Sequence, residues 1–301
     1  MPTNNCAVQW FTCMFANLSG FLLIIRRRGL LQRVESMSQS LLFGISALFA
    51  LMPATLVGFR ANGGRDALFW ATLAVALAGP LAWFVVQMSG AWQTGLSPAL
   101  WATITASIII YAGTAGLTDQ AWRLAPLVGG YLILIGVVAL VWQHAPETAQ
   151  RVSAPGIWTT VHIVVSVSTY GLVTIAAVSA LAAFLQERAL KTKQPTRLTR
   201  ILPSVTDCER LLVKLLVIGE GVLALGLASG IAVNIGSSHT AISLDHKTIL
   251  TIATFVVIGG LLLAHFRTGV RGRIVTRFVL LAYLLLTLGY PGVKFVTDVL
   301  L

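Results

Sequence analysis

The strongest constraint on the fold of this chain is a succession of eight long apolar stretches. They cover residues 41–59, 67–88, 100–116, 124–142, 157–185, 211–235, 248–266 and 278–297. Each is near the length of about 20 residues that an α-helix needs to cross the hydrocarbon core of a bilayer. A helix also satisfies all of its backbone hydrogen bonds internally, as lipid requires. The sequence therefore predicts an all-α, polytopic membrane protein with eight transmembrane helices.

The composition agrees with a membrane protein and argues against a nucleic-acid-binding one. Of the 301 residues, 56% are hydrophobic and only 10% are charged, whereas soluble domains carry about 25% charged residues. The net charge is +11, but the basic residues are concentrated between the apolar stretches. Such clustering is typical of cytoplasmic loops. We therefore expect membrane lipid, and no nucleic acid, as a partner. No nucleophile constellation or nucleotide-binding loop indicates an enzyme.

The connections between the apolar stretches alternate in charge and so predict a topology. The connections "QERALKTKQPTRLTRILPSVTDCER" and "RTGVRGRIVTR" are basic, whereas "SGAWQTGLSP" and "NIGSSHTAISLDHK" are poor in Lys and Arg. The positive-inside rule places the basic set in the cytoplasm and the other set outside. With eight spans, we expect a multi-pass protein of a bacterial inner membrane with its C-terminus on the outer, periplasmic side.

The N-terminal segment does not fit this alternation. Residues 7–25 are apolar, but the basic sequence "RRRGLLQR" follows them, and a ninth span there would place these arginines outside the cell. We therefore interpret residues 1–36 as an N-terminal extension and residues 37–301 as the transmembrane domain. A ninth helix at the N-terminus is the alternative.

The five histidines are unevenly distributed over this topology. His144, His162, His239 and His246 fall at the outer face, and His265 falls at the cytoplasmic end of the seventh span. His246 and His265 lie on the same predicted helix, and the rise of 1.5 Å per residue separates them by about 28 Å. They cannot bind the same metal ion, so any chemistry that involves both histidines takes place at two separate depths of the membrane.

Two of the predicted spans carry polar side chains that are unfavourable in contact with lipid. His162, Ser166 and Tyr170 follow one another at helical spacing and form a polar stripe on the fifth span. Glu220 lies near the middle of the sixth span, where a charged group costs about 2.5–3.5 kcal/mol on insertion scales. Such residues face the interior of the bundle or a cavity. A plain hydrogen bond between helices is the alternative for His162, and a protonated carboxyl bonded to Tyr170 or a backbone carbonyl is the alternative for Glu220.

The second half of the chain resembles the cytochrome c assembly family of haem-handling membrane proteins, in particular its CcsA-like group and the YpjD-type branch of that group. The resemblance rests on five segments in the same order along the chain. They are "GIWTTVHIVVSVSTYGLVTIAAVSALAAFLQERALK", "LPSVTDCERLL", "LDHKTIL", "LLLAHFRTGVRGR" and "YPGVKFVTDVLL". The likeness covers about residues 120–301, and it extends to the first four spans in hydropathy alone.

The resemblance implies a haem site at the outer face. His162 matches the first external histidine of the family, and His265 matches the histidine that ends the following helix. The run from Ser243 to Lys247 matches the family's Trp-Asp-Pro-Lys segment, which holds haem, and it retains Asp245 and Lys247. The chain departs from the family because Leu244 replaces the tryptophan and because no histidine follows "GVKFV". These departures favour the YpjD-type branch over a full haem lyase.

The resemblance therefore suggests residues that bind haem. We expect His162 and His246 to form the outer pair of iron ligands, with a slot between their helices, and His265 to mark a separate inner site. Lys247 and Lys294 are the cations expected to pair with haem propionates. Asp245 is expected to cap the helix that follows it.

Three functions remain to be distinguished. The first is a haem-binding protein that assists cytochrome c biogenesis or haem-pathway assembly, with other cytochrome c maturation proteins as partners. The second is a transporter that uses Glu220 and His265 as proton or ion sites, and the third is a structural subunit without a ligand. No internal repeat of the kind common in transporters is found.

Overall fold

The computed structural model describes residues 40–60, 64–88, 95–144, 156–238 and 245–292, and all regular structure in these ranges is helical. The chain divides into two compact units, Met1–Ile45 and Ser46–Leu301. In the first unit, residues 40–45 are described and are helical. The candidate site lies wholly in the second unit. The predicted all-α fold is confirmed, whereas the N-terminal segment 1–36 lies outside the described residues.

Seven helices are long and apolar enough to cross a membrane within the described ranges. They are Ser40–Val57, α2 (Ala67–Met88), α3 (Leu96–Leu117), Ala121–Val141, which joins the 3₁₀-helix η1 (Ala121–Leu124) to α4 (Ala125–Val141), α5 (Ile157–Thr192), α7 (Val205–Ser238) and α8 (His246–Thr268). The eighth expected span corresponds to α9 (Arg273–Thr287), which is shorter and continues as a π-helical turn, η3 (Leu288–Gly292). The protein is thus a multi-pass helical membrane protein, and the count of eight is approximate.

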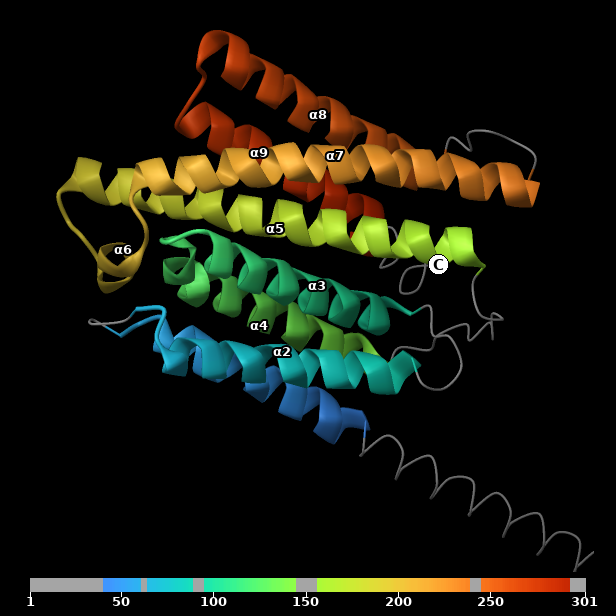
Figure 1. Cartoon of the computed structure of the whole chain (residues 1–301), viewed down its shortest axis with the longest axis horizontal. Helices are drawn as coiled ribbons and strands as arrows, with labels where there is room; N and C mark the ends of the chain where they lie inside the picture. Colours follow the sequence, from blue (N-terminus) through green and yellow to red (C-terminus); the bar gives the residue numbers. More distant parts are fainter. Residues whose placement is uncertain (1–39, 61–63, 89–94, 145–155, 239–244, 293–301) are drawn as a thin grey trace, which may run out of the picture. The chain divides into compact units, whose positions relative to one another are not determined.

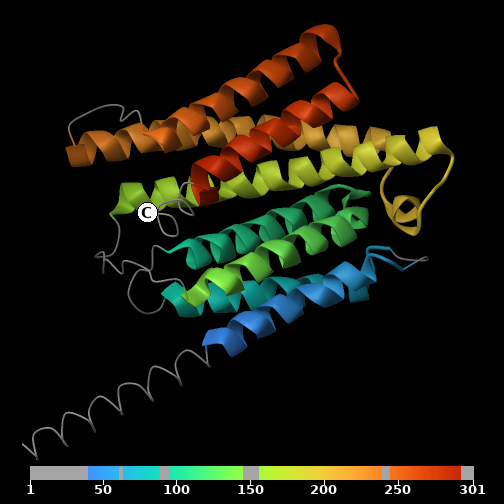
Figure 2. The same ribbon diagram turned by 180° about the vertical axis from the view of Figure 1, so that it is seen from behind.

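Helix α5 is the centre around which the second unit is packed. It contacts α3, α7 and α9, and its contact with α7 is the most extensive between any two helices of the described chain. Figure 1 shows the two long helices side by side, and Figure 2 shows α9 between α5 and α8 on the other side. The buried part of α5 is rich in small residues such as Ala176, Ser179 and Ala180, which are fully buried. Small residues allow helices in a membrane to approach closely.

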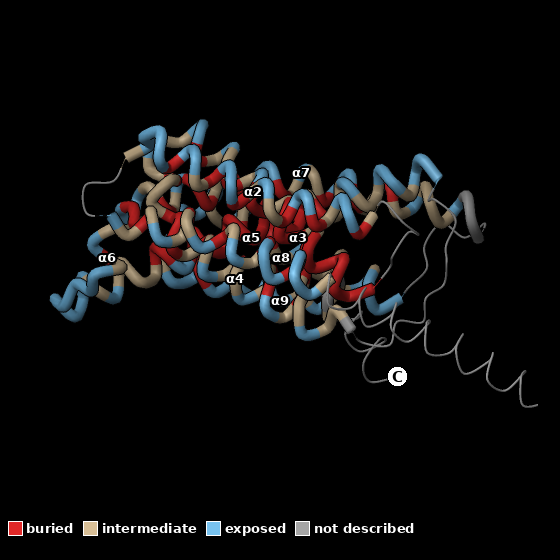
Figure 3. Tube along the Cα trace, turned by 90° about the horizontal axis from the view of Figure 1, so that it is seen from below, coloured by how far each residue is buried: buried red, intermediate tan, exposed pale blue. Residues whose placement is uncertain are grey.

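Apolar side chains divide between the interior and the periphery of this bundle. Trp101, Ile104, Ile175 and Leu212 are among the large residues that are completely buried, and Figure 3 shows such positions along the inner faces of the helices. Leu134, Val256 and Leu263 are instead more than half exposed. Since lipid tails are as apolar as these side chains, their exposure is the arrangement expected of a bundle embedded in a bilayer.

Helices α5 and α7 are joined at one end by a compact basic connection, which we call the basic end of the bundle. It contains the short helix α6 (Arg197–Ile201). The side-chain amide of Gln186, from α5, lies 2.7 Å from the carbonyl oxygen of Thr199 and 3.0 Å from that of Leu202. The hydroxyl of Ser204 accepts a hydrogen bond from the backbone N–H of Asp207 at 3.2 Å, which caps α7. The opposite end, where α5 and α8 begin, is called the cavity end after the cavity that is described in the next section.

Candidate functional site

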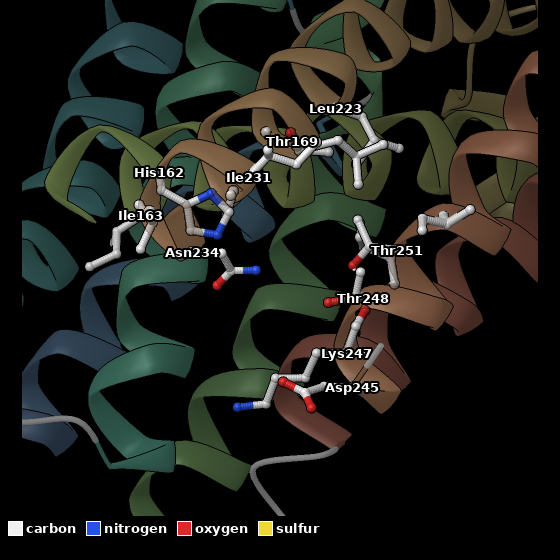
Figure 4. Close-up of a pocket in the computed structure, with 18 of the residues that line it drawn as sticks. His162, Ile163, Thr169, Leu223, Ile231, Asn234, Asp245, Lys247, Thr248 and Thr251 are labelled. Carbon is white, nitrogen blue, oxygen red and sulfur yellow. Dashed lines mark hydrogen bonds between the residues drawn. The ribbon is translucent and has the colours of Figure 1, made fainter. Parts of the chain in front are cut away.

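A cavity of about 460 Å³ lies between α5, α7, α8 and the end of α9. Its volume is within the range of about 300–1,000 Å³ that is usual for small-molecule sites. The polar residues of its wall come from three helices and are His162, Ser166, Thr169, Tyr170, Asn234, Asp245, Lys247, Thr248 and Thr251. Figure 4 shows His162 and Asn234 on one side and the residues of α8 on the other. Three residues named from the sequence as one polar stripe, His162, Ser166 and Tyr170, therefore do line one cavity.

The imidazole of His162 is held by a hydroxyl group of the neighbouring helix. Its Nδ1 atom lies 3.0 Å from Oγ of Ser229, and the Ser229 hydroxyl donates its own hydrogen to the carbonyl oxygen of Gly226 at 2.9 Å. Because that hydrogen is already used, Oγ of Ser229 accepts and Nδ1 of His162 donates. The imidazole is then the tautomer whose Nε2 atom carries a free lone pair, which is the form that binds metals.

The start of α8 forms the opposite wall of the cavity. Asp245 occupies the N-cap position of this helix, as predicted, but its side chain makes no capping hydrogen bond. Its carboxylate instead lines the cavity together with the side chain of Lys247 (Figure 4). The hydroxyl of Thr251 donates to the carbonyl oxygen of Lys247 at 2.8 Å, so the oxygen of Thr251 is left as an acceptor toward the cavity.

His246 is placed differently from its two neighbours. It is the first residue of α8, it is exposed, and it is not among the residues that line the cavity. The structure therefore brings His162 together with Asp245 and Lys247 but not with His246. Lys294 and His239 lie outside the described residues.

Tyr170 connects the inner wall of the cavity to a cluster of tyrosines. Its hydroxyl oxygen lies 3.1 Å from that of Tyr283 on α9 and 3.4 Å from that of Tyr131 on α4, and the hydroxyls of Tyr131 and Tyr283 also hydrogen-bond to each other. Thr287 donates its hydroxyl hydrogen to the carbonyl oxygen of Tyr283 at 2.8 Å. Its oxygen therefore accepts from Tyr170, 3.4 Å away. This network ties three helices together at the deep end of the cavity.

His265 lies at the basic end, at the far end of α8 from Asp245. Its Nδ1 atom lies 2.9 Å from the carbonyl oxygen of Val270. A carbonyl oxygen only accepts, so Nδ1 of His265 donates this hydrogen bond. The backbone oxygen of His265 accepts from the N–H of Gly269 at 3.0 Å. The imidazole ring and the backbone carbonyl group of His265 are thus both hydrogen-bonded to the turn that follows α8. His265 lies about 28 Å of helix rise from His246.

Two carboxylates from other helices hold the turn between α8 and α9. Glu209 of α7 accepts a hydrogen bond from the backbone N–H of Gly272 at 3.0 Å. Glu187 of α5 lies 4.0 Å from the guanidinium Nε of Arg273. Gly272 has a φ of 68° and a ψ of −136°, a conformation that is open to glycine and costly for other residues. The backbone that orients His265 is therefore anchored to α5 and α7.

Glu220 does not line the cavity, and its carboxyl is directed at α8. Its Oε2 atom is buried and has no hydrogen-bond partner among the described residues. No hydrogen bond between Glu220 and Tyr170 is found there either.

Sequence reasoning missed Ser229 and Asn234 on α7 and Tyr283 on α9. All three are polar residues within otherwise apolar stretches. This signal singled out Glu220 and was available for them as well.

Within the described ranges, no three His, Cys, Asp or Glu side chains are grouped as a metal cluster would require. The cavity therefore does not suit an ion held by several protein ligands. A haem iron needs only one or two axial ligands, because the macrocycle supplies the others. A neutral imidazole with a free Nε2 meets that requirement, and the cation Lys247 suits a propionate.

Comparison with known proteins identifies the family of the chain. The family model described as "Cytochrome C assembly protein" matches residues 8–301. The chain belongs to this family. Membership of the cytochrome c assembly family supports a role in cytochrome c biogenesis, and the resemblance found in the second half of the sequence is confirmed.

Two curated proteins are similar in sequence to this member of the cytochrome c assembly family. The first, described as "Uncharacterized 28.8 kDa protein in nifR3-like 5'region" from Azospirillum brasilense, is 54% identical over 270 residues, which are 88% of this chain and all of that protein. The second, "Inner membrane protein YpjD" from Escherichia coli K12, is 28% identical over 184 residues, which are 60% of this chain and 67% of YpjD. No solved structure matches.

Proposed function

We propose that this protein is a bacterial inner-membrane protein that binds haem in the cavity and assists cytochrome c biogenesis, with His162 as an axial ligand. One observation carries this proposal. The hydrogen bond from Nδ1 of His162 to Ser229, at 3.0 Å, leaves Nε2 unprotonated within a cavity of ligand size. Metal-binding histidines typically donate their second ring N–H to an oxygen atom in this way.

The rest of the cavity wall is amphipathic. Leu223, Ile231 and Leu286 are apolar wall residues, whereas Lys247 and Asn234 supply hydrogen-bond donors. Haem, when bound, supplies an iron with two axial positions and two propionate groups. Lys247 would hold a propionate through a charge-assisted hydrogen bond, while Asp245 beside it limits the positive charge at the mouth.

The second axial ligand and the inner site are further parts of the proposal. His246 adjoins two residues that line the cavity, and it is exposed at the first position of α8, where helix ends fray. We propose it as the second ligand, which requires the first turn of α8 to rearrange, because His246 does not line the cavity in this structure. His265, whose Nδ1 donates to the carbonyl oxygen of Val270, is assigned to a separate inner site at the basic end. Neighbouring cytochrome c maturation proteins would be the partners.

The test is an absorption spectrum of the full-length protein, purified in detergent and titrated with haem. His162→Ala should abolish the spectrum of the cavity-bound haem, and His246→Ala should convert it from a two-histidine to a one-histidine form. His265→Ala is the matched control because it removes an identical side chain at the other end of α8, and it should leave the cavity spectrum intact. Unchanged haem affinity and spectrum in His162→Ala would refute the cavity site.

A further inference from the structure

Glu220 carries a carboxyl group in the middle of a membrane-spanning helix. This group is not part of the proposed haem site. It is close to the midpoint of α7, which runs from Val205 to Ser238. It is partly buried, and it is absent from the wall of the cavity. An ionisable residue at this depth is costly and marks a functional site by default.

The immediate surroundings of Glu220 contain room for its carboxyl but no counter-charge. A Cβ atom added to Gly259 of α8 would lie 2.9 Å from Oε1 of Glu220, so the glycine leaves the space that the carboxyl occupies. Oε2 is buried without a hydrogen-bond partner in the described ranges. Gly219, beside Glu220, faces Leu172 and Val173 of α5. The neighbouring surfaces of α5 and α8 are therefore apolar at this level.

Tyr170, two residues before Leu172 on α5, is the titratable side chain nearest to this level, and the charged groups on the helices around Glu220 lie farther along those helices. Lys214 is six residues away on α7 and is exposed, which corresponds to about 9 Å of helix rise. His265 is six residues beyond Gly259 on α8, again about 9 Å. Asp245 and Lys247 lie at the mouth of the cavity. Without an adjacent cation, the neutral, protonated carboxyl is the form that these surroundings favour.

Glu220 also continues the face of α7 that lines the cavity. The lining residues Leu223, Leu227 and Asn234 follow at helical spacing, and residues three and four apart lie on the same face of a helix. Glu220 is one turn deeper than Leu223 along that face. The carboxyl thus lies next beyond the deep end of a cavity whose wall is rich in hydroxyl groups.

We propose that Glu220 is a proton-binding site at the interface of α7 and α8 and that it exchanges its proton with water in the cavity. The ligand is a proton, because a single carboxyl without neighbouring oxygen or nitrogen ligands does not hold a metal cation. Gly259 leaves the space that the carboxyl occupies, and Leu223, one turn along α7, is the first residue of that face to line the cavity. This inference is independent of haem binding.

Infrared spectroscopy of the full-length, haem-free protein in detergent tests the proposal directly. At neutral pH, the wild-type protein should show the carbonyl band of a protonated carboxylic acid, and the isosteric variant Glu220→Gln should lack it. On transfer to heavy water the band should shift, because the proton exchanges. A hydrophobic carbodiimide, which reacts with protonated carboxyls in apolar surroundings, should label the wild-type protein at Glu220, as read by mass spectrometry.

A pair of glycine variants tests the route through the cavity. Gly226 lines the cavity, and an added Cβ atom there would make only an ordinary contact with Val165, whereas one at Gly221 would meet nothing within 4 Å. Gly226→Leu should fill the cavity and slow the band shift about tenfold or more, because water is excluded. Gly221→Leu, the matched control on the same helix, should leave the rate unchanged.

Three results would overturn the inference. They are the absence of a band that depends on Glu220 in wild-type protein, a band that never shifts in heavy water, and equal rates of shift in the two glycine variants. The first would show an ionised carboxylate, the second a sealed carboxyl, and the third a route other than the cavity. Thermal unfolding of each variant confirms that the protein is folded before its spectrum is compared.

Discussion

Nδ1 of His162 and Oγ of Ser229 lie 3.0 Å apart across the interface of α5 and α7. Because the Ser229 hydroxyl also lies 2.9 Å from the carbonyl oxygen of Gly226, which only accepts, we assign the hydroxyl hydrogen to Gly226 and the ring hydrogen to Nδ1 of His162. A single serine on one helix thereby determines which nitrogen of a histidine on another helix is available to a ligand. The oxygen partners of metal-bound histidines tune affinity in the same way.

Replacement of Ser229 should therefore weaken haem binding without unfolding the protein. In Ser229→Ala, Nδ1 of His162 loses its acceptor, the ring is free to rotate, and haem affinity should fall about 10- to 100-fold. Ser179→Ala is the matched control, because the Ser179 hydroxyl is buried and has no hydrogen-bond partner in the described ranges. Spectroscopic titration measures both affinities, and equal values in the two variants would count against the assigned tautomer.

Removal of the Lys247 side chain should selectively weaken binding of the propionate groups. A hydrogen bond to a charged group contributes about 1.5–3 kcal/mol, so Lys247→Ala should lower haem affinity by about tenfold or more. The loss should shrink for a haem dimethyl ester, which lacks the charges. Lys214→Ala, at an exposed position of α7, is the control. A loss of the same size for haem and its ester would exclude a role in propionate binding.

The turn after α8 should tolerate substitution at one of its glycines and not at the other. Gly269 has a φ of 67° and a ψ of 25°, a left-handed conformation that Asn accepts. Gly272 has a ψ of −136°, and Gly272→Asn should cost about 1–3 kcal/mol in strain. Thermal unfolding in detergent compares the two. If Gly269→Asn were the more destabilising variant, the backbone conformation of Gly272 would not be the more strained of the two.

The cavity end is predicted to face the periplasm. A cysteine placed at Ser238, the last residue of α7, in a variant without its native cysteines should react with an impermeant thiol reagent added to intact spheroplasts. A cysteine at Arg200, in the basic connection, should react only after the membrane is opened. The reverse pattern of labelling would invert the whole topology.

Deletion of residues 1–36 should leave membrane insertion and haem binding intact. The reason is charge parity, because the basic sequence "RRRGLLQR" would lie on the wrong side of the membrane if this segment were a further span. Membrane fractionation followed by the haem titration measures both properties. Failure of the shortened chain to insert would establish a ninth helix.

Hydropathy predicted where helices cross lipid but not where they end. The stretch 67–88 coincides with α2, whereas the stretch 157–185 ends well before α5, which continues to Thr192. The added segment, "QERALKT", consists mostly of good helix formers, and it lies outside the apolar window because water solvates its charges. Hydropathy indicates which residues lie in lipid and which lie in water. The length of a helix also depends on the helix propensity of its residues and on its caps, such as the C-cap Lys193 of α5, which has a φ of 53°.

The candidate site was predictable in part. The stripe from His162 to Tyr170 was visible because it lies on a single helix. Ser229 could be noticed as a polar residue in an apolar stretch, but its pairing with His162 could not be predicted, because the rotation of α7 about its axis is set by packing against α5. The position of His246 could not be read from sequence either. Asp245 has an extended backbone at the N-cap, so side-chain directions there do not follow helical spacing.

The unequal lengths of the helices have a mechanical consequence. With 36 residues, α5 is about 54 Å long, whereas the hydrocarbon core is about 30 Å thick. Together with α7, which packs along it, it forms a stiff beam that continues past the bilayer at the basic end. A tilt of about 5° at the cavity end would move the far tip by about 5 Å, by simple geometry of a rod of this length. Because its ends lie beyond the hydrocarbon core, any rigid tilt of this helix pair displaces the tips more than the part that is inside the bilayer.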